Sequence, residues 1–431
     1  MKAAVIGLGK IGLPLAVQIA GRGIATTGAD IAPDVVATIN AGIPPFPGES
    51  DLDERLGAVI ADHMFRATTS TEEAVAAADV AIVVVPLVVD ASGAPDFRGI
   101  DGATAAVGRA LQPGQLVVYE TTVPIGTTRG RFGPALESLS GLTMGKDFHL
   151  AFSPERVSSG TVFRDLRTYP KVVGGVDAGS TKVAVDFYER SLEFDDRPDL
   201  QQPNGVWNVG SAEAAEFVKL AETTYRDVNI ALANEFATHA ESLGLDVWDI
   251  IAAANSQPFS HIHRPGVAVG GHCIPVYPRF YLAGDPSAVL PMAARKINEA
   301  QPDRIVARLE AMIGTLNNKT VAVLGAAYRG GVKEMAFSGV FAVANAIELR
   351  GGRCVVHDPL FDDGELRSVG FEPYAMGALV DAAVVQTDHG EYRNLKPADL
   401  PGCRAIIDGR GVLESRVWEA SDAGFAVVGA G

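Results

Sequence analysis

Short apolar runs alternate with amphipathic segments through the first 150 residues of the chain. The runs KAAVIG, ATTGAD, VAIVVVP, LVVYET and FHLAFS are bounded by polar or turn-forming residues, which is typical of short buried strands. The segments LPLAVQIAGRG and TEEAVAAAD lie between them and carry apolar residues at helical spacing. Strands that alternate with helices predict a parallel, doubly wound sheet.

The pattern changes at about residue 211, where apolar residues recur at helical spacing without a proline or glycine until Gly244. This pattern predicts one long helix. From Asn317 a second α/β pattern begins, with strands expected in NKTVAVLGAAYRG, RCVVHDP, AAVVQTD and CRAIIDGRG. The predicted fold class is therefore α/β, with two Rossmann-like doubly wound domains of parallel sheet joined by a central long-helix domain.

The first predicted strand is followed directly by three glycines in the spacing G-x-G-x-x-G. Gly7 permits a tight turn, Gly9 lets a pyrophosphate approach the backbone, and Gly12 allows close packing of the next helix. The N-terminus of that helix offers N–H groups and a favourable dipole to phosphates. Asp30 ends the next strand, where a carboxylate binds the ribose and disfavours a 2′-phosphate. Strand, glycines, helix and acid in this order predict an NAD site.

Composition narrows the function classes. The 431 residues carry a net charge of −16, which argues against a general nucleic-acid binder. No stretch of about 18 uninterrupted apolar residues is present, so no membrane span is expected. The first residues resemble a strand and turn, without the features of a signal peptide. The three cysteines form no C-x-x-C pair, so we expect no disulfide framework, no metal site and a cytoplasmic protein.

The segment RPGVAVGGHCIPVYP holds the residue of greatest chemical interest, Cys273. Gly270 and Gly271 make the backbone before it open and tight. A thiol beside a helix end or a cation can act as a nucleophile. From the residues alone, however, an isolated cysteine is more often a small buried apolar side chain.

Five motifs taken together favour the nucleophile over the buried apolar cysteine: GLGKIGLPLA, SPERV, KLAETTYRDVNIALANE, VGGHCIPVYP and VVQTDHGEY. The chain resembles the UDP-glucose/GDP-mannose dehydrogenase family, and within it the branch that oxidises UDP-N-acetylhexosamines. The resemblance implies an NAD-binding domain over residues 1–196, a central helical dimerisation domain over 197–312 and a UDP-sugar-binding domain over 313–431. It also implies a homodimer formed through the central helix, a UDP-sugar substrate, and a role in polysaccharide biosynthesis.

The resemblance also assigns the site residues. Those implied to be catalytic are Cys273, Lys219, Glu155 and Thr122. Those implied to bind NAD are Gly7, Gly9, Lys10, Ile11, Gly12, Asp30, Pro86, Thr122 and Arg329. Those implied to bind the sugar nucleotide are Glu155, Arg156, Lys219, Thr223, Arg264, Gly270, Tyr277 and Arg410. Without the resemblance, Lys219 would be interpreted as a solvated helix lysine, and Glu155 with Arg156 as a surface ion pair.

The implied reaction removes two hydrides from the C6 hydroxymethyl group of a UDP-N-acetylhexosamine or UDP-glucose and gives the uronic acid. The first oxidation gives an aldehyde, which the Cys273 thiolate attacks, and the second gives a thioester, with two NAD consumed. Water held by Thr122 and Glu155 then hydrolyses the thioester. Lys219 either stabilises the oxyanion or, with its pKa lowered by burial, acts as a base.

Three departures from the family pattern are present. Tyr277 replaces an aspartate four residues after the cysteine, and a tyrosine of ordinary pKa near 10 is no carboxylate base. Thr223 replaces an asparagine on the long helix. Ala336 and Phe337 replace an Arg-Glu pair in the C-terminal segment, where Arg329 retains the charge of a lysine.

These departures leave open a two-electron enzyme that stops at the aldehyde and a non-catalytic nucleotide-sugar-binding relative. We favour the dehydrogenase because Cys273, Lys219, Glu155 and Thr122 are all present. The histidines His261, His263 and His272 lie near Cys273 in sequence. A metal site there is disfavoured because no carboxylate completes the spacing, and we expect His261 and His263 to line the entrance to the sugar site.

Overall fold

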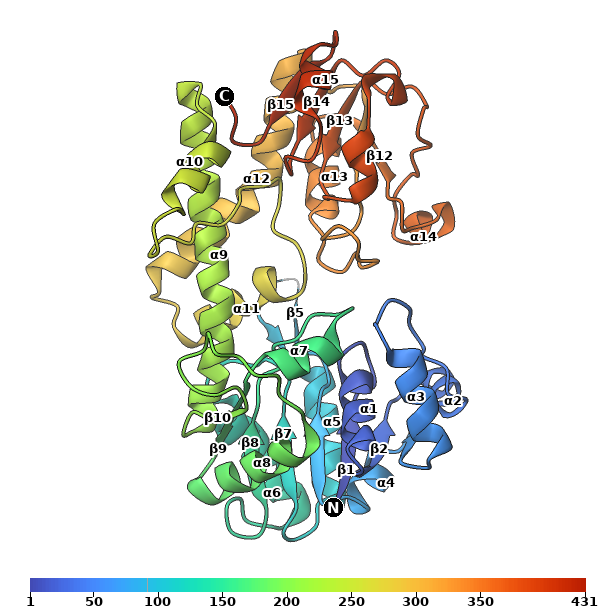
Figure 1. The fold of residues 1–431 in the computed structure, drawn as a ribbon, viewed down its shortest axis with the longest axis vertical. Helices are drawn as coiled ribbons and strands as arrows, with labels where there is room; N and C mark the ends of the chain where they lie inside the picture. Colours follow the sequence, from blue (N-terminus) through green and yellow to red (C-terminus); the bar gives the residue numbers. More distant parts are fainter. Residues whose placement is uncertain (91) are drawn as a thin grey trace. The chain divides into compact units, whose positions relative to one another are not determined.

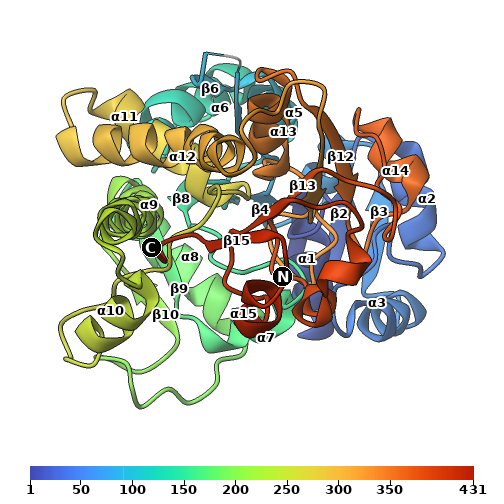
Figure 2. The ribbon, with the colours of Figure 1, turned by 90° about the horizontal axis from the view of Figure 1, so that it is seen from above.

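The computed structural model describes residues 1–90 and 92–431 and divides into two compact units, each built on its own sheet (Figure 1). Unit 1 comprises Met1–Glu222 and Arg279–Gly284, and unit 2 comprises Thr223–Pro278 and Asp285–Gly431. The boundary between the units falls inside the long helix α9 (Ala212–Leu243). This helix confirms the long helix predicted from about residue 211, and Figure 2 views it nearly along its axis. The division into three domains stays a prediction.

The sheet of unit 1 has eight strands, and the strands predicted from the sequence lie within it. In sheet order the strands are β10 (Val206–Asn208), β9 (Lys171–Gly175), β8 (His149–Phe152), β7 (Leu116–Tyr119), β4 (Val80–Val83), β1 (Lys2–Ile6), β2 (Ala25–Ala29) and β3 (Phe65–Thr68). Every neighbouring pair is parallel except β8 and β9, which run antiparallel. The chain order reverses between β1 and β4, which is where a doubly wound sheet binds its ligand.

Helices cover this sheet because their apolar faces join its core, as in α1, which is buried along nearly its whole length. A small antiparallel pair of strands, β5 (Val88–Val89) and β6 (Pro95–Asp96), stands apart from the main sheet. The helices of unit 1 are α1 (Gly12–Gly21), α2 (Pro33–Asn40), α3 (Leu52–Ala61), α4 (Thr71–Ala76), α5 (Arg98–Ala110), η1 (Thr128–Phe132), α6 (Gly133–Ser140), α7 (Val162–Thr168) and α8 (Ala178–Ser191).

Unit 2 contains a second, fully parallel sheet of five strands. In sheet order they are β12 (Arg353–His357), β11 (Thr320–Leu324), β13 (Ala382–Val385), β14 (Ala405–Asp408) and β15 (Gly424–Val427). The chain order reverses between β11 and β13. The predicted class, two Rossmann-like α/β sheets with a long helix between them in sequence, is confirmed.

Helices α12 and α13 pack on this sheet and share its apolar core. Besides its part of α9, unit 2 contains the helices α10 (Val247–Ala254), α11 (Cys273–Gly284), α12 (Val289–Ile313), α13 (Val340–Glu348), α14 (Asp363–Ser368), η2 (Gly390–Asn394), η3 (Pro397–Asp399) and α15 (Ser415–Glu419), of which α11 is divided between the two units. In the described part of the chain, no helix combines the length and apolar character needed to cross a membrane.

Candidate active site

The turn between β1 and α1 has the geometry that the glycine spacing predicted. Gly7 adopts φ +94°, and a Cβ on Gly12 would lie 1.9 Å from the Gly7 carbonyl oxygen, so a larger residue cannot replace Gly12 without moving backbone. A Cβ on Gly9, by contrast, would meet no atom within 4 Å. The backbone at Gly9 is therefore open to a ligand beside the first turn of α1, where a pyrophosphate binds.

Asp30 lies beside this turn and is half-buried. Its Oδ2 accepts the N–H of Leu8 at 2.9 Å, and its Oδ1 accepts the N–H of Ala32 at 3.0 Å. Each oxygen retains acceptor capacity, which suits a ribose hydroxyl. Lys10 and Ile11 belong to the same turn, and the exposed Pro86 lies just beyond the neighbouring strand β4. These residues fit a dinucleotide without a 2′-phosphate.

A buried polar cluster lies at the ends of β7 and β9. The Lys171 ammonium donates to Glu120 Oε2 at 2.8 Å and lies 3.9 Å from Glu155 Oε2. The Tyr188 hydroxyl donates to the other oxygen of Glu120. Glu120 is completely buried, and Lys171 is 5% exposed. A buried cation needs a charged partner, and Lys171 has two, Glu120 in direct contact and Glu155 further away.

Burial raises the pKa of Glu120 to about 7, although the Lys171 charge opposes that shift. Burial also acts to raise the pKa of Glu155. The Lys171 charge and the Val157 N–H outweigh it, so the pKa of Glu155 lies below its ordinary value. Glu155 is therefore ionised at neutral pH, and Lys171 is the main reason.

Glu155 and Lys219 are brought together in unit 1. The Lys219 ammonium donates to the main-chain oxygen of Glu155, while Glu155 Oε1 accepts the N–H groups of Arg156 at 2.6 Å and Val157 at 2.8 Å. Lys219 is only 8% exposed, so the interpretation as a solvated helix lysine is wrong. Arg156 forms its ion pair with Glu222 of α9, and not with Glu155.

Thr122 is buried and follows Glu120 by two residues at the end of β7. The segment after it is fastened to α9 by the fully buried Glu216, whose oxygens accept the N–H groups of Gly126 at 2.5 Å and Thr128 at 2.8 Å. Burial raises the pKa of Glu216 to about 7, against the effect of these hydrogen bonds. Glu216 thereby fixes the position of the Thr122 segment relative to the helix that carries Lys219.

Cys273 is the first residue of α11, and the segment before it packs on the second sheet. Val267 belongs to the core of that sheet. A Cβ on Gly409 would lie 1.8 Å from Val267 Cγ2, and a Cβ on Gly339 would lie 2.4 Å from the Cβ of Ala268. Glycines after β14 and before α13 therefore let the cysteine segment lie against the carboxyl edge of the sheet, where ligands of open α/β sheets bind.

The residues next to Cys273 contact the loop that follows β11. The Gly271 N–H donates to the Phe337 carbonyl at 3.1 Å, and a Cβ on Gly270 would lie 3.0 Å from Tyr328 Cβ. His272 Nδ1 lies 3.0 Å from the Tyr277 hydroxyl. The His272 ring also meets the Phe337 ring edge-on, with centroids 5.2 Å apart. Two of the three departures from the family pattern therefore surround one histidine.

The predicted arginines other than Arg156 lie on unit 2. Arg410 pairs with Asp388 at 3.3 Å and comes within 3.4 Å of the position a Cβ would take on Gly266. Arg264 is exposed, with its guanidinium 5.8 Å from the Trp248 ring centre. The remaining predicted residues of this unit are the exposed Arg329, on the loop after β11, and the buried Thr223, on α9.

The predicted residues therefore fall into two groups. Unit 1 holds the glycine turn, Asp30, Thr122, Glu155 and Lys219, whereas unit 2 holds Cys273, Tyr277 and the predicted arginines other than Arg156. Arg329, predicted to bind NAD, belongs to unit 2, whereas the glycine turn belongs to unit 1. Among residues 1–90 and 92–431, no group of three or more His, Cys, Asp or Glu side chains is arranged to hold a metal ion.

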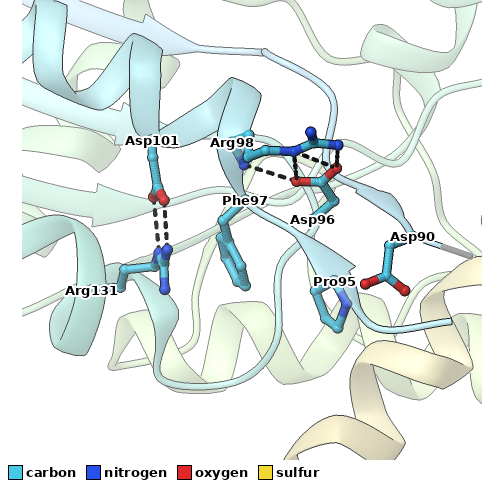
Figure 3. A pocket seen from close by; sticks show the side chains of 7 residues that line it. All are labelled: Asp90, Pro95, Asp96, Phe97, Arg98, Asp101 and Arg131. Carbon is cyan, nitrogen blue, oxygen red and sulfur yellow. Dashed lines mark hydrogen bonds and ion pairs between the residues drawn. The ribbon is translucent and has the colours of Figure 1, made fainter. Parts of the chain in front are cut away.

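A hollow of about 310 Å³ elsewhere in unit 1 contains none of the predicted site residues (Figure 3). Both of its arginines are paired with carboxylates: Arg98 pairs with Asp96 at 2.5 Å, and Arg131 pairs with Asp101 at 2.5 Å. Asp90 is a third carboxylate of the lining, so the hollow offers no excess of positive charge for an anionic substrate.

Four residues of these clusters were not predicted from the sequence: Glu120, Lys171, Tyr188 and Glu216. A charged residue at the end of an apolar strand was a signal for Glu120 in LVVYE and for Lys171 in KVVGG. Their partnership depends on the pairing of distant segments, which one sequence does not reveal. Glu216 is hidden within the amphipathic pattern of the long helix.

Comparison with known protein families gives three matches along the chain. Residues 1–192 match the NAD binding domain of the UDP-glucose/GDP-mannose dehydrogenase family. Residues 213–300 match the central domain of that family, and residues 322–415 match its UDP binding domain.

Individual relatives resemble the chain over nearly its full length. A UDP-N-acetyl-D-mannosamine dehydrogenase of Pyrococcus horikoshii is 34% identical over 422 residues, which covers 96% of each chain. An NDP-N-acetyl-D-galactosaminuronic acid dehydrogenase of Ralstonia nicotianae is 31% identical, again over 96% of each chain. The solved structure of a UDP-D-ManNAc dehydrogenase from Pyrococcus horikoshii superposes with a TM-score of 0.87 at 31% identity over 100% of both chains.

Proposed function

The chain belongs to the UDP-glucose/GDP-mannose dehydrogenase family and is an NAD-dependent nucleotide-sugar dehydrogenase. From this premise we propose that it oxidises the C6 hydroxymethyl group of a UDP-N-acetylhexosamine to the carboxylate. The observation that carries the proposal is the packing of the Cys273 segment on the carboxyl edge of the second sheet, because it holds a thiol where a sugar nucleotide would bind. The names of the similar proteins support an N-acetylated sugar.

Cofactor binding rests on the turn of Gly7, Gly9 and Gly12 and on Asp30. The open backbone at Gly9 receives the pyrophosphate, and the Asp30 carboxylate accepts hydrogen bonds from the adenosine ribose. Bound NAD supplies the hydride acceptor for both oxidations. Lys10, Ile11, Pro86, Thr122 and Arg329 are the further residues proposed to contact it.

Cys273 carries the covalent step. The thiolate donates an electron pair to C6 of the aldehyde, a C–S bond forms, and the carbonyl π electrons move to oxygen, giving a thiohemiacetal. Removal of the C6 hydride leaves a thioester. Water then adds to the thioester carbon, the C–S bond breaks, and the carboxylate and thiol are released. Covalent capture keeps the aldehyde from escaping between the two oxidations.

The buried cluster of unit 1 supports the charged and proton-transfer steps. Lys219 stabilises the oxygen anion as it develops. Glu155, kept ionised by Lys171, takes a proton from the attacking water, and Thr122 orients that water. Lys171 and Glu120 act on Glu155 through its charge and position, and they do not touch the substrate.

The sugar nucleotide is held by remote contacts that place C6 for reaction. Arg410 and Arg264 are proposed to bind the diphosphate, because a guanidinium matches phosphate geometry. The other residues proposed to contact the substrate are Glu155, Arg156, Lys219, Thr223, Gly270 and Tyr277.

A homodimer through α9 is the proposed assembly. Tyr225, Leu232, Phe236 and Leu243 are 39–58% exposed and lie on one side of the helix by their spacing of seven, four and seven residues. An exposed apolar stripe on a long helix suits a self-complementary contact with a second copy. Light scattering should give a dimer mass for the wild type and a monomer mass for a Leu232→Glu, Phe236→Glu double variant. A monomeric wild type would contradict this assembly.

The activity is tested by the NADH released per sugar consumed. Purified protein with excess NAD is given UDP-N-acetylmannosamine, UDP-N-acetylglucosamine, UDP-glucose or GDP-mannose in turn. We expect two molecules of NADH for each molecule of UDP-N-acetylhexosamine that is consumed. One NADH would place the end of the reaction at the aldehyde. No NADH with any of these sugars would contradict the proposed substrates.

A further inference from the structure

The position four residues after Cys273 presents a chemical problem. A carboxylate there would accept a proton from the thiol at neutral pH, whereas a phenol of ordinary pKa near 10 would not. The proposed reaction nevertheless needs a thiolate. A tyrosine at this position therefore requires a second group that accepts the proton.

The structure supplies such a group beside Tyr277. Its hydroxyl lies 3.0 Å from His272 Nδ1, and the two rings meet edge-on with centroids 5.3 Å apart. Tyr277 is 9% exposed, so the hydrogen bond is shielded from competing water. With its own proton on Nε2, His272 accepts the Tyr277 hydroxyl at Nδ1. An imidazole can accept a proton near neutral pH, and it therefore supplies the base that the phenol alone does not provide.

Helix geometry places the pair beside the nucleophile. Cys273 begins α11, and Tyr277 is one turn further along the helix. Residues four apart lie on one face, and side chains lean toward the N-terminus of the helix, so the Tyr277 side chain leans toward the turn that begins with Cys273.

The loop after β11 fixes the histidine in place. The Phe337 ring packs edge-on against His272, and the Phe337 carbonyl accepts the Gly271 N–H. Phe337 adopts φ +55°, an uncommon conformation for an aromatic residue. An apolar ring here replaces the acidic residue typical of the family, so it adds no negative charge next to the imidazole. The departures at Tyr277 and Phe337 therefore act on one histidine.

Three other titratable or charged groups belong to the elements packed against this segment. The Tyr328 ring would lie 3.1 Å from a Cβ on Gly271. The Arg329 guanidinium lies 5.9 Å from the Tyr328 ring centre, and the Glu334 carbonyl accepts the Tyr328 N–H at 3.1 Å.

We propose that His272 and Tyr277 form a proton-transfer pair that serves the Cys273 thiol in place of a carboxylate. As the S–H bond breaks, its proton passes to the Tyr277 oxygen while the Tyr277 hydroxyl proton passes to His272 Nδ1. The sulfur electron pair then forms the C–S bond, and the imidazolium returns its proton by the same path when hydrolysis releases the thiolate. His272 acts through Tyr277 and is a positioning residue. The inference rests on the proposed role of Cys273.

The first test measures alkylation of Cys273 by iodoacetamide against pH, followed on the Cys273 peptide by mass spectrometry. The wild type should react with a midpoint about one pH unit or more below that of Tyr277→Phe and His272→Asn, and these two variants should share one midpoint. Tyr281→Phe is the matched control: it makes the same change on α11 at a residue whose ring packs on Phe217 and does not belong to the pair, so its midpoint should equal that of the wild type. Equal midpoints for wild type, Tyr277→Phe and His272→Asn would overturn the pair.

The second test uses a double-mutant cycle with kcat and KM for NADH formation. With Tyr at position 277, His272→Asn should lower kcat about 10–100-fold at neutral pH and change KM little. Tyr277→Asp should retain kcat within about threefold, and His272→Asn should have no further effect on that background. Equal losses on both backgrounds would show a merely structural histidine and overturn the proposal. The alkylation profile needs no substrate, so it distinguishes failure of the pair from failure of the proposed function.

Discussion

The two sheets repeat one local design around an acidic residue, and they use that acid differently. In unit 1, β1 leads into Gly7 and β2 into Asp30; in unit 2, β11 leads into Gly325, which adopts φ +106°, and β12 into Asp358. Each aspartate accepts the N–H of the residue after the glycine, at 2.9 Å for Asp30 and 2.7 Å for Asp358. Each also accepts the N–H of the second residue after itself.

The difference lies in what surrounds the two carboxylates. Asp30 is half-buried beside an open turn. Asp358 is 4% exposed, accepts an additional N–H from Ala327 and lies 3.0 Å from Nε2 of the buried His389. Burial acts to raise the pKa of Asp358, but His389 and the backbone N–H groups lower it overall. A carboxylate with spare acceptor capacity can bind a ribose, whereas one enclosed by the protein holds a loop in place.

The largest contrast should come from removing each carboxylate. Asp358→Ala leaves several buried donors without an acceptor and should cost on the order of 3–5 kcal/mol of unfolding free energy. Asp30→Ala should cost about 1 kcal/mol but weaken NAD binding about tenfold or more. Urea unfolding and NAD titration measure the two effects. Equal destabilisation by both substitutions would remove the distinction between the two sheets.

The glycine loops provide a second contrast. A Cβ on Gly330 would lie 2.3 Å from the Asp388 carbonyl oxygen, so Gly330→Ala should destabilise the protein by about 2 kcal/mol. Gly9→Ala meets no protein atom and should leave the melting temperature unchanged, while its methyl group displaces the pyrophosphate and lowers NAD affinity. Calorimetry with and without NAD checks both. A Gly9→Ala protein with normal NAD affinity would contradict the assignment of the open turn.

The buried acids of the two units should also respond to pH in opposite directions. The pKa of Glu216 is raised to about 7, so its contribution to stability is full at low pH and declines as pH rises through 7. The pKa of Asp358 is lowered, so its contribution is present at neutral pH and is lost only as pH falls below its ordinary range. Between pH 5 and 8, Glu216→Gln should therefore gain about 2 kcal/mol relative to the wild type. Parallel stability curves for the two proteins would contradict the raised pKa.

Those features of the two sheets that depend on neighbouring residues in the chain could be predicted from the sequence. Gly7, Gly9, Gly12 and Asp30 follow a spacing set by the turn itself, and the structure reproduces that turn. Most strands of both sheets were predicted from their apolar runs. The strands β3, β9, β10 and β15, and the antiparallel pairing of β9, were not predicted, because each contains glycine or polar residues that are also typical of loops.

The nonlocal partners could not be predicted. Lys171 and Glu120 are 51 residues apart, and His389 and Asp358 are 31 apart, so only the folded sheets bring them together. His272 was considered as part of a histidine cluster, and Tyr277 as a departure from the family and a substrate contact, but the two residues were not paired. The hydrogen bond that joins them depends on where α11 begins, and no local pattern in the sequence predicts that residue.

The most direct test of the central claim is uronic acid formation by Cys273→Ala, measured by chromatography of the sugar nucleotide after incubation with NAD. The substitution should lower acid formation at least about 10³-fold because the covalent step is lost. NAD binding and melting temperature should stay at wild-type values, which shows that the fold is intact. Acid formation at the wild-type rate by Cys273→Ala would contradict the claim that Cys273 is the nucleophile.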